Sequence, residues 1–297
     1  MQVSAGNTRI EVDDQGPASA EPLLLIMGLG MQLTAWPAAL VQLLLARGFR
    51  VIRMDNRDAG LSQGFDHLGA PNLAWAGMRY TLKMRVRAPY RLSDMAADAL
   101  GVLDALGLQR AHVCGASLGG MVAQHLAASQ PQRVASLTLM MSTSGARHLP
   151  QAALRVRAVL LSRPASAAPA DVVAHLMRVL AVIGSPGFET SPDEQVRRLS
   201  AMVARAWRPA GTARQLAAVL ADGDRSALLP NISAPTHIIH GDSDPLVPVA
   251  AGIDLAARIA GATSDLVPGM GHDLPAALLA RFADGIQANA NRARRSV

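Results

Sequence analysis

Short apolar runs alternate with segments of helical periodicity along most of this 297-residue chain. Runs of about four to seven apolar residues are typical of buried strands, and the helical segments between them are typical of crossover connections. A chain with this alternation folds as a parallel sheet with helices packed on its faces. We therefore predict the α/β class, with a mostly parallel central sheet flanked by helices.

The alternation assigns most elements of the core. The predicted strands cover residues 9–12, 23–27, 50–54, 111–114, 134–141, 237–240 and 264–267. The predicted helices cover residues 36–46, 93–106, 118–129, 249–259 and 275–288. Ser93 is expected to cap its helix, because a serine side chain can accept a hydrogen bond from the first helical N–H groups. Residues 13–16 are polar, end in glycine and are expected to form a turn.

From about residue 145 to 230 the alternation stops, and helices with Pro and Gly joints follow without a convincing strand. Residues 191–194 read Ser-Pro-Asp-Glu, a capping box with Pro at the first helical position, and predict a helix toward Trp207. Thr212 is expected to cap a further helix. We predict a first core segment at 1–144, an inserted helical cap at 145–230 and a second core segment at 231–297. Arg205 and Arg214 are expected on a solvated face of the cap, with contact to an anionic substrate as the alternative.

Composition excludes several classes of protein. Half of the residues are apolar and 17% are charged, which excludes intrinsic disorder. The net charge is +6, but three of the arginines, at 292, 294 and 295, lie in what reads as a frayed tail, so no nucleic-acid partner is expected. The lone Cys114 excludes an intramolecular disulfide and a cysteine-based zinc site. No apolar run approaches the roughly 18 residues that span a bilayer, and no signal peptide is evident. We expect a cytoplasmic protein without a membrane partner.

The strongest motif reads Gly-Ala-Ser-Leu-Gly at residues 115–119, between a predicted strand and a predicted helix. This is the strand–turn–helix context that the G-x-S-x-G pattern requires. Its glycines allow a sharp turn that lifts the Ser117 hydroxyl above the edge of the sheet. The backbone N–H of Leu118 then faces the same space and can bind a developing oxyanion. A glycine-rich turn with a helix-capping serine is the alternative interpretation.

A nucleophilic serine needs a base, and the base needs an orienting acid. In this architecture the order along the chain is Ser, acid, His. His272 lies in a glycine-flanked loop after the last predicted strand and is the candidate base. Asp242 and Asp244 follow the preceding strand. We choose Asp244 because Pro245 stiffens its turn, whereas Asp242 is better placed to bond its own backbone.

A second oxyanion donor is expected from residues 27–31, which read Met-Gly-Leu-Gly-Met. Glycines let a backbone N–H approach a substrate oxygen, and the N–H of Leu29 is the candidate. Position 33 is leucine, so the dinucleotide pattern G-x-G-x-x-G fails. Gly28, Met177 and Trp207 are candidate substrate-binding residues, although packing of the cap helices is the competing interpretation for the last two. No metal site is predicted, because no recognisable ligand spacing occurs.

These segments resemble the α/β-hydrolase fold superfamily over nearly the whole chain. The matching stretches read PLLLIMGLGMQLTAW, RVIRMDNRDAGLS, HVCGASLGGMVAQ, HIIHGDSDPLVP and VPGMGHDLP. The resemblance implies Ser117 as nucleophile, Asp244 as acid, His272 as base, and Leu29 and Leu118 as oxyanion donors beneath a helical lid. The most similar branch contains serine esterases such as bacterial carboxylesterases and anthracycline methylesterases, and it shares the Met-Gly start of the oxyanion loop.

Two positions depart from the family pattern. Many members have His-Gly where this chain has Met27-Gly28, which removes one orienting hydrogen bond. In the loop D-x-R-G-x-G-x-S, Asp58 replaces a glycine. Arg57 of the same loop is expected to anchor neighbouring loops.

The sequence therefore predicts a serine hydrolase that cleaves carboxylic esters of small or medium apolar substrates through an acyl-enzyme, without a cofactor. The same residues can serve a lactonase, amidase, C–C hydrolase, acyltransferase or cofactor-free perhydrolase. The alternative of another class is a non-catalytic ligand-binding receptor on a hydrolase scaffold. The expected partner is a small-molecule ester, and a homodimer is a possible assembly.

Overall fold

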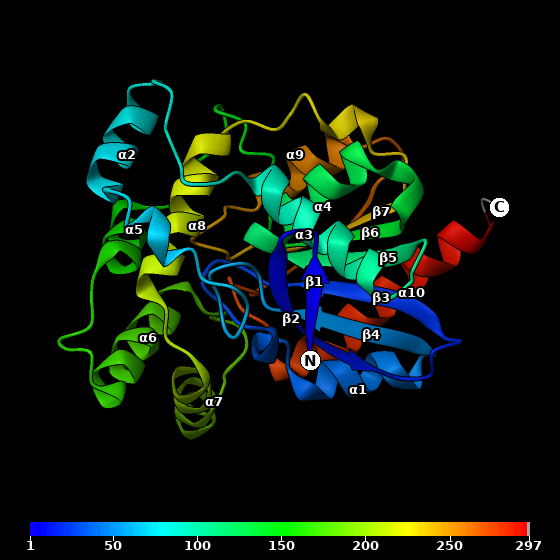
Figure 1. The fold of residues 1–297 in the computed structure, drawn as a ribbon, viewed down its shortest axis with the longest axis horizontal. Helices are drawn as coiled ribbons and strands as arrows, with labels where there is room; N and C mark the ends of the chain where they lie inside the picture. Colours follow the sequence, from blue (N-terminus) through cyan, green and yellow to red (C-terminus); the bar gives the residue numbers. More distant parts are fainter. Residues whose placement is uncertain (296–297) are drawn as a thin grey trace.

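A computed structural model describes residues 1–295 and has an eight-stranded sheet at its centre (Figure 1). The strands are β1 (Gln2–Ala5), β2 (Thr8–Gln15), β3 (Glu21–Ile26), β4 (Phe49–Met54), β5 (Ala111–Ala116), β6 (Val134–Met140), β7 (Thr236–Gly241) and β8 (Thr263–Val267). Their order in the sheet is β1-β2-β4-β3-β5-β6-β7-β8. β1 and β2 pair antiparallel with their neighbours, and all other pairs are parallel. The predicted α/β class is confirmed.

Helices cover both faces of the sheet (Figure 1). One face carries α1 (Ala38–Ala46) and α10 (Leu279–Arg295), and the other carries α3 (Leu92–Ala105), α4 (Leu118–Ser129) and α9 (Ala250–Arg258). β3 shows why both faces are apolar, since Leu23 and Leu25 pack in the core under α1 and α10, and Leu24 and Ile26 in the core under α3 and α4. Side chains alternate along a strand, so a continuous apolar run fills two cores.

Four helices between β6 and β7 form a unit that we call the cap. They are α5 (Leu154–Leu161), α6 (Pro169–Ile183), α7 (Pro192–Arg205) and α8 (Pro209–Asp222). Their own apolar cluster consists of Val172, Val173, Leu199, Met202 and Val203. The cap lies at one end of the molecule together with α2 (Leu73–Thr81), which packs on α8 (Figure 1). Among residues 1–295, no helix combines the length and apolar character needed to cross a membrane.

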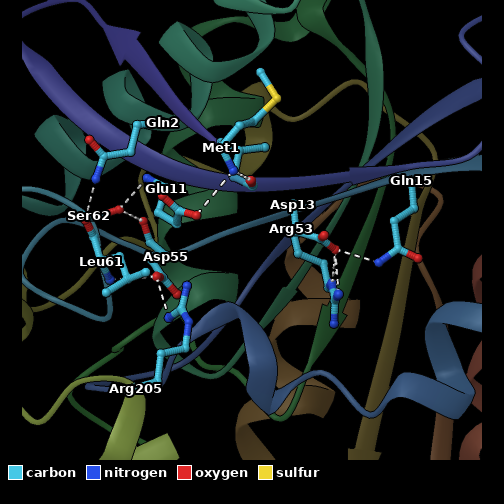
Figure 2. A network of polar contacts seen from close by, with 11 residues as sticks. Met1, Gln2, Glu11, Asp13, Gln15, Arg53, Asp55, Leu61, Ser62 and Arg205 are labelled. Carbon is cyan, nitrogen blue, oxygen red and sulfur yellow. Dashed lines mark hydrogen bonds and ion pairs between the residues drawn. The ribbon is translucent and has the colours of Figure 1, made fainter.

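The N-terminal segment differs from the prediction. Residues 9–12 are part of the longer strand β2, and Asp13–Gln15, expected in a turn, continue that strand by pairing with β4. Arg53 of β4 donates hydrogen bonds to Asp13, as Figure 2 shows. β1 was not predicted, and it forms because it pairs antiparallel with β2. Both errors concern pairing with other strands, which the local pattern does not encode.

The capping of three helices also differs from the prediction. α3 begins at Leu92, and Asp94, not Ser93, closes its first turn by accepting a hydrogen bond from the backbone N–H of Arg91 at 2.8 Å. α7 follows Ser191 as predicted, but the serine side chain makes no capping hydrogen bond. α8 begins before Thr212, which therefore lies inside the helix and does not cap it.

The C-terminal segment is helical where a frayed tail was expected. α10 continues through Arg295. Arg294 donates hydrogen bonds to both carboxylate oxygens of Glu21, at 2.8 and 2.6 Å. This partly exposed ion pair attaches the last turns of α10 to the start of β3, so this end of the helix is folded onto the sheet and is not a frayed tail.

Candidate active site

Ser117 lies in a strained turn between β5 and α4. Its backbone has φ 54° and ψ −118°, a left-handed φ that a residue other than glycine rarely adopts. A Cβ atom on Gly115 would lie 2.3 Å from the carbonyl oxygen of Gly119, and one on Gly119 would lie 2.0 Å from that of Ile26. Both positions therefore require glycine, and the turn holds the serine side chain at the carboxyl end of β5.

The structure brings the three predicted residues Ser117, His272 and Asp244 together. His272 Nε2 lies 3.0 Å from Ser117 Oγ, and His272 Nδ1 lies 2.7 Å from Asp244 Oδ2. The histidine side chain is 8% exposed and the aspartate side chain is completely buried. A neutral imidazole that donates from Nδ1 to the carboxylate leaves Nε2 free to accept the serine proton.

Asp244 is held by its own turn. Its Oδ1 accepts hydrogen bonds from the backbone N–H groups of Leu246 at 2.9 Å and Val247 at 2.8 Å. Asp242 instead accepts a hydrogen bond from the backbone N–H of Gly269, in the loop that leads to His272. The choice of Asp244 agrees with this geometry, but the reason given for it was wrong, because Asp244 is the residue that bonds its own turn.

His240 is a buried residue of the site that sequence analysis did not identify as a functional residue. Its Nε2 donates a hydrogen bond to the Val247 carbonyl at 2.8 Å and lies 3.7 Å from Asp244 Oδ2. Burial lowers its pKa, which favours the neutral ring. Its Nδ1 has no hydrogen-bond partner among the described residues. His240 therefore fixes the turn that carries Asp244. The available signal was its position at the end of β7, the strand that leads to this turn.

Hydrogen bonds from the cap hold the loop that carries His272. The backbone N–H of His272 donates to the carbonyl of Ile183 at 2.7 Å, and that of Gly271 donates to Ser185 Oγ at 2.8 Å. Ser185 also donates a hydrogen bond to Asp273. Burial raises the pKa of Asp273, against the opposing effect of this hydrogen bond. The residues at the end of α6 thus help to position the candidate base over the carboxyl edge of the sheet.

Two backbone N–H groups are free beside Ser117. Within residues 1–295, neither the N–H of Leu29 nor that of Leu118 has a hydrogen-bond acceptor. The Gly28 carbonyl accepts a hydrogen bond from the N–H of Met31 at 3.2 Å. A Cβ on Gly28 would lie 3.3 Å from Ser117 Cβ, so the loop passes directly beside the serine. These are the two donors that the sequence proposed for an oxyanion.

The candidate substrate residues of the cap are engaged in packing. Met177 and Trp207 pack against the apolar cluster of the cap, and Met31 of the oxyanion loop packs there too. A cleft of about 510 Å³ separates cap and core beside the acid and base loops. Its lining includes Arg155, Leu180 and Phe188 from the cap and Ser243, Pro245 and Asp273 from the core.

Buried ion pairs join the cap to the core loop at residues 55–62. Arg205 of α7 donates a hydrogen bond to Asp55 at 2.7 Å, which Figure 2 shows beside Leu61 and Ser62. Arg214 of α8 donates two hydrogen bonds of 2.8 Å to Asp58. Burial opposes ionisation of Asp58, but the Arg214 guanidinium together with the hydrogen bonds from Phe65 and Tyr90 outweighs it and lowers the pKa of the carboxyl. The expectation that these arginines lie on a solvated face was wrong, since the Arg214 side chain is 2% exposed.

Arg57 anchors its own loop to helix α3, whereas contacts with neighbouring loops were expected. Its guanidinium donates to both carboxylate oxygens of Asp98 in α3, at 2.6 and 2.8 Å. Cys114 is buried in β5, and burial raises the pKa of its thiol, so it is not a competing nucleophile. Among residues 1–295, no three His, Cys, Asp or Glu side chains gather as a metal site would require.

Comparison with known proteins identifies the class that this fold and site define. A family model described as the alpha/beta hydrolase fold matches residues 21–275. Rhodomycin D methylesterase DauP from Streptomyces sp. (strain C5) is 30% identical, over 93% of each chain. A 2-hydroxy-6-oxononadienedioate/2-hydroxy-6-oxononatrienedioate hydrolase from Cupriavidus pinatubonensis is 30% identical, over 92% of this chain and 88% of the relative. The chain therefore belongs to the alpha/beta hydrolase fold family and is a hydrolase.

A solved structure gives the same fold. The meta-cleavage product hydrolase CumD from Pseudomonas fluorescens IP01, in a mutant form complexed with acetates, superposes with a TM-score of 0.75, covering 99% of this chain and 98% of that chain. At 19% identity this likeness concerns the fold alone.

Proposed function

We propose that the protein is a serine esterase that cleaves carboxylic esters of small or medium apolar substrates. The proposal rests on the continuous chain of hydrogen bonds from Ser117 Oγ through His272 to Asp244, at 3.0 and 2.7 Å. A serine hydroxyl becomes a nucleophile only when a base takes its proton as it attacks. Similarity to a methylesterase at 30% identity supports an ester as the substrate.

The chemistry proceeds in two halves. His272 takes the proton of Ser117 while the serine oxygen attacks the ester carbonyl, and the N–H groups of Leu29 and Leu118 bind the resulting oxyanion. The imidazolium returns the proton to the leaving alcohol, which leaves an acyl group on Ser117. Water, deprotonated by His272, then attacks the acyl carbonyl, and the imidazolium returns the proton to the Ser117 oxygen as its bond to the acyl group breaks and the acid is released. Asp244 stabilises the imidazolium in both halves.

The pairing of the cap arginines Arg205 and Arg214 favours a neutral ester over a dianionic substrate. Arg205 and Arg214 are committed to buried aspartates and are not free to bind a substrate carboxylate. Hydrolysis of a dicarboxylate such as 2-hydroxy-6-oxononadienedioate, the substrate named for one relative, is therefore the second candidate.

Ser117→Ala tests the proposal on p-nitrophenyl esters of increasing acyl length. Removal of a catalytic serine lowers kcat by about 10⁶ in a well-studied serine hydrolase, so we expect activity to fall to background. Ser129→Ala is the matched control, because Ser129 ends the same helix and, among residues 1–295, its hydroxyl bonds only the backbone of that helix. A fluorophosphonate probe should label Ser117, as peptide mass spectrometry will show. An active Ser117→Ala variant, or turnover of the dienedioate with no turnover of any ester, contradicts the proposal.

A further inference from the structure

The cap reaches the oxyanion loop through one completely buried side chain, Gln215 of α8. Its Oε1 accepts a hydrogen bond from the backbone N–H of Gly30 at 2.8 Å. Its Nε2 donates a hydrogen bond to the carbonyl of Arg57 at 2.7 Å. The two partners belong to different core loops, so this one amide bridges the oxyanion loop and the loop after β4.

The bonded N–H lies next to the candidate oxyanion donor. Gly30 shares a peptide plane with Leu29, so fixing the Gly30 N–H fixes the orientation of the Leu29–Gly30 peptide. The preceding peptide is fixed by the hydrogen bond from Met31 N–H to the Gly28 carbonyl, at 3.2 Å. In a trans peptide the N–H points opposite to the C=O, so this bond directs the Leu29 N–H away from the turn. Both peptides that flank Leu29 are therefore held.

α8 also restrains the loop sterically. Gly30 has φ +65°, and a Cβ on it would lie 2.6 Å from Thr212 Oγ1, one turn before Gln215. On the other side, Gly28 passes beside Ser117. The loop is enclosed between the cap helix and the serine, and a shift of α8 would displace the donor.

The helix that carries Gln215 is itself anchored. Arg214, the preceding residue, forms the buried ion pair with Asp58. At the other end of the loop, Arg205 of α7 donates to Gln32 Oε1 at 2.7 Å, and Gln32 Nε2 donates to the carbonyl of Met202 at 2.8 Å. These contacts make α7 and α8 fixed supports of the oxyanion loop.

We infer that Gln215 is a positioning residue, which holds the Leu29 N–H where the oxyanion forms. The inference rests on the proposed function, because it assigns Leu29 as an oxyanion donor. Gln215 does not touch the reacting atoms in this arrangement. Gln215 acts through the loop that it positions. It stabilises the transition state, in which the oxyanion has formed, and does not strengthen binding of the substrate.

Gln215→Met tests the inference, since methionine keeps the volume and loses both hydrogen bonds. We expect kcat to fall by about 10- to 100-fold, the range for a misplaced or weakened oxyanion donor, with KM changed less than about threefold. A trifluoromethyl ketone, which forms an oxyanion on adding Ser117, should bind more weakly by the same factor. The corresponding methyl ketone, tested as an unreactive analogue, should bind as before.

Gln124→Met is the matched control. Gln124 is also completely buried and makes two side-chain hydrogen bonds, one to the carbonyl of Thr143 and one from Arg225, but none to the oxyanion loop. It should lose thermal stability comparably and keep kcat within about twofold. If Gln215→Met does not fold, Gln215→Asn replaces it, because its shorter side chain cannot reach both partners, and Gln124→Asn becomes the control.

Three results overturn the inference. They are a folded Gln215 variant with wild-type kcat and trifluoromethyl ketone affinity, an equal loss of kcat in the Gln124 control, and an equal loss of affinity for the methyl ketone. Ser117→Ala separates this failure from that of the proposed function. If Ser117→Ala is inactive and the Gln215 variant is fully active, only the positioning role is wrong.

Discussion

The buried pair between Asp58 and Arg214 gives a prediction whose size follows from the structure. The Asp58 side chain is completely buried and the Arg214 side chain is 2% exposed. Asp58 also accepts hydrogen bonds from Tyr90 Oη and the Phe65 N–H, both at 2.8 Å. Arg214→Met leaves this carboxylate buried without its cation, which costs about 3–5 kcal/mol of unfolding free energy. The second partner of Arg214, Asp66, is 79% exposed and contributes little.

Asp58→Gly acts in two opposing ways. Asp58 has φ 66°, so glycine relieves about 1 kcal/mol of backbone strain, while Arg214 loses its buried partner. We therefore expect a net loss of about 2–4 kcal/mol. The double variant Arg214→Met/Asp58→Gly leaves neither an unpaired carboxylate nor an unpaired guanidinium in the interior. Its loss of unfolding free energy should therefore be smaller than the sum of the two single losses by about 2–3 kcal/mol.

Equilibrium unfolding in urea at pH 7.5 measures these values. Arg281→Met is the control, because Arg281 pairs with Asp265 through two similar hydrogen bonds at an exposed position, and its loss should stay below about 1 kcal/mol. The pKa of Asp58 is lowered in the fold, so its contribution is complete above about pH 4 and is lost only as the pH falls further. The reasoning is refuted if Arg214→Met lowers the unfolding free energy by less than about 1 kcal/mol. It is also refuted if the losses of the two single variants simply add in the double variant.

Two further predictions concern the triad and the buried histidines. Asp244→Asn should lower kcat for p-nitrophenyl esters by about 10⁴ while the circular dichroism spectrum stays native, because the amide favours the wrong imidazole tautomer; a loss below about tenfold contradicts this. Burial lowers the pKa values of His112, His237 and His240, so the unfolded chain binds protons more readily than the fold. The unfolding free energy should therefore decrease as pH falls through about 6.5. Urea titrations at pH 7.5 and pH 5.5 measure this change, and greater stability at pH 5.5 would contradict the prediction.

Elements whose signal is local were predictable from the sequence. α4 has the predicted bounds, Leu118 to Ser129, and the ends of β3, β4 and β7 lie within two residues of their predicted positions. The Ser117 turn was predictable because the glycines on both sides are a steric requirement of the turn itself. β1 and the last turns of α10 were missed because they depend on pairing with β2 and on the Glu21–Arg294 ion pair.

The cap shows the limit of local reasoning most clearly. Arg205 and Arg214 have helical spacing that suits a solvated face, and nothing near them in the chain reveals an acidic partner. Their partners, Asp55 and Asp58, lie about 150 residues earlier. In the sequence, Asp58 was notable only because it replaces a glycine of the family pattern. The structure explains the aspartate, because its carboxylate pairs with the buried guanidinium of Arg214.

The sequence by itself determined the α/β fold, the turn at Ser117 and the order of the candidate serine, acid and base, because strand periodicity, glycine sterics and chain order are written in neighbouring residues. Tertiary structure decided how these groups are held: His240 behind Asp244, the end of α6 on the His272 loop, and Gln215 on the oxyanion loop. Each of these contacts joins segments brought together only by folding. Burial then makes the contacts decisive, because an unpaired polar group away from water is costly.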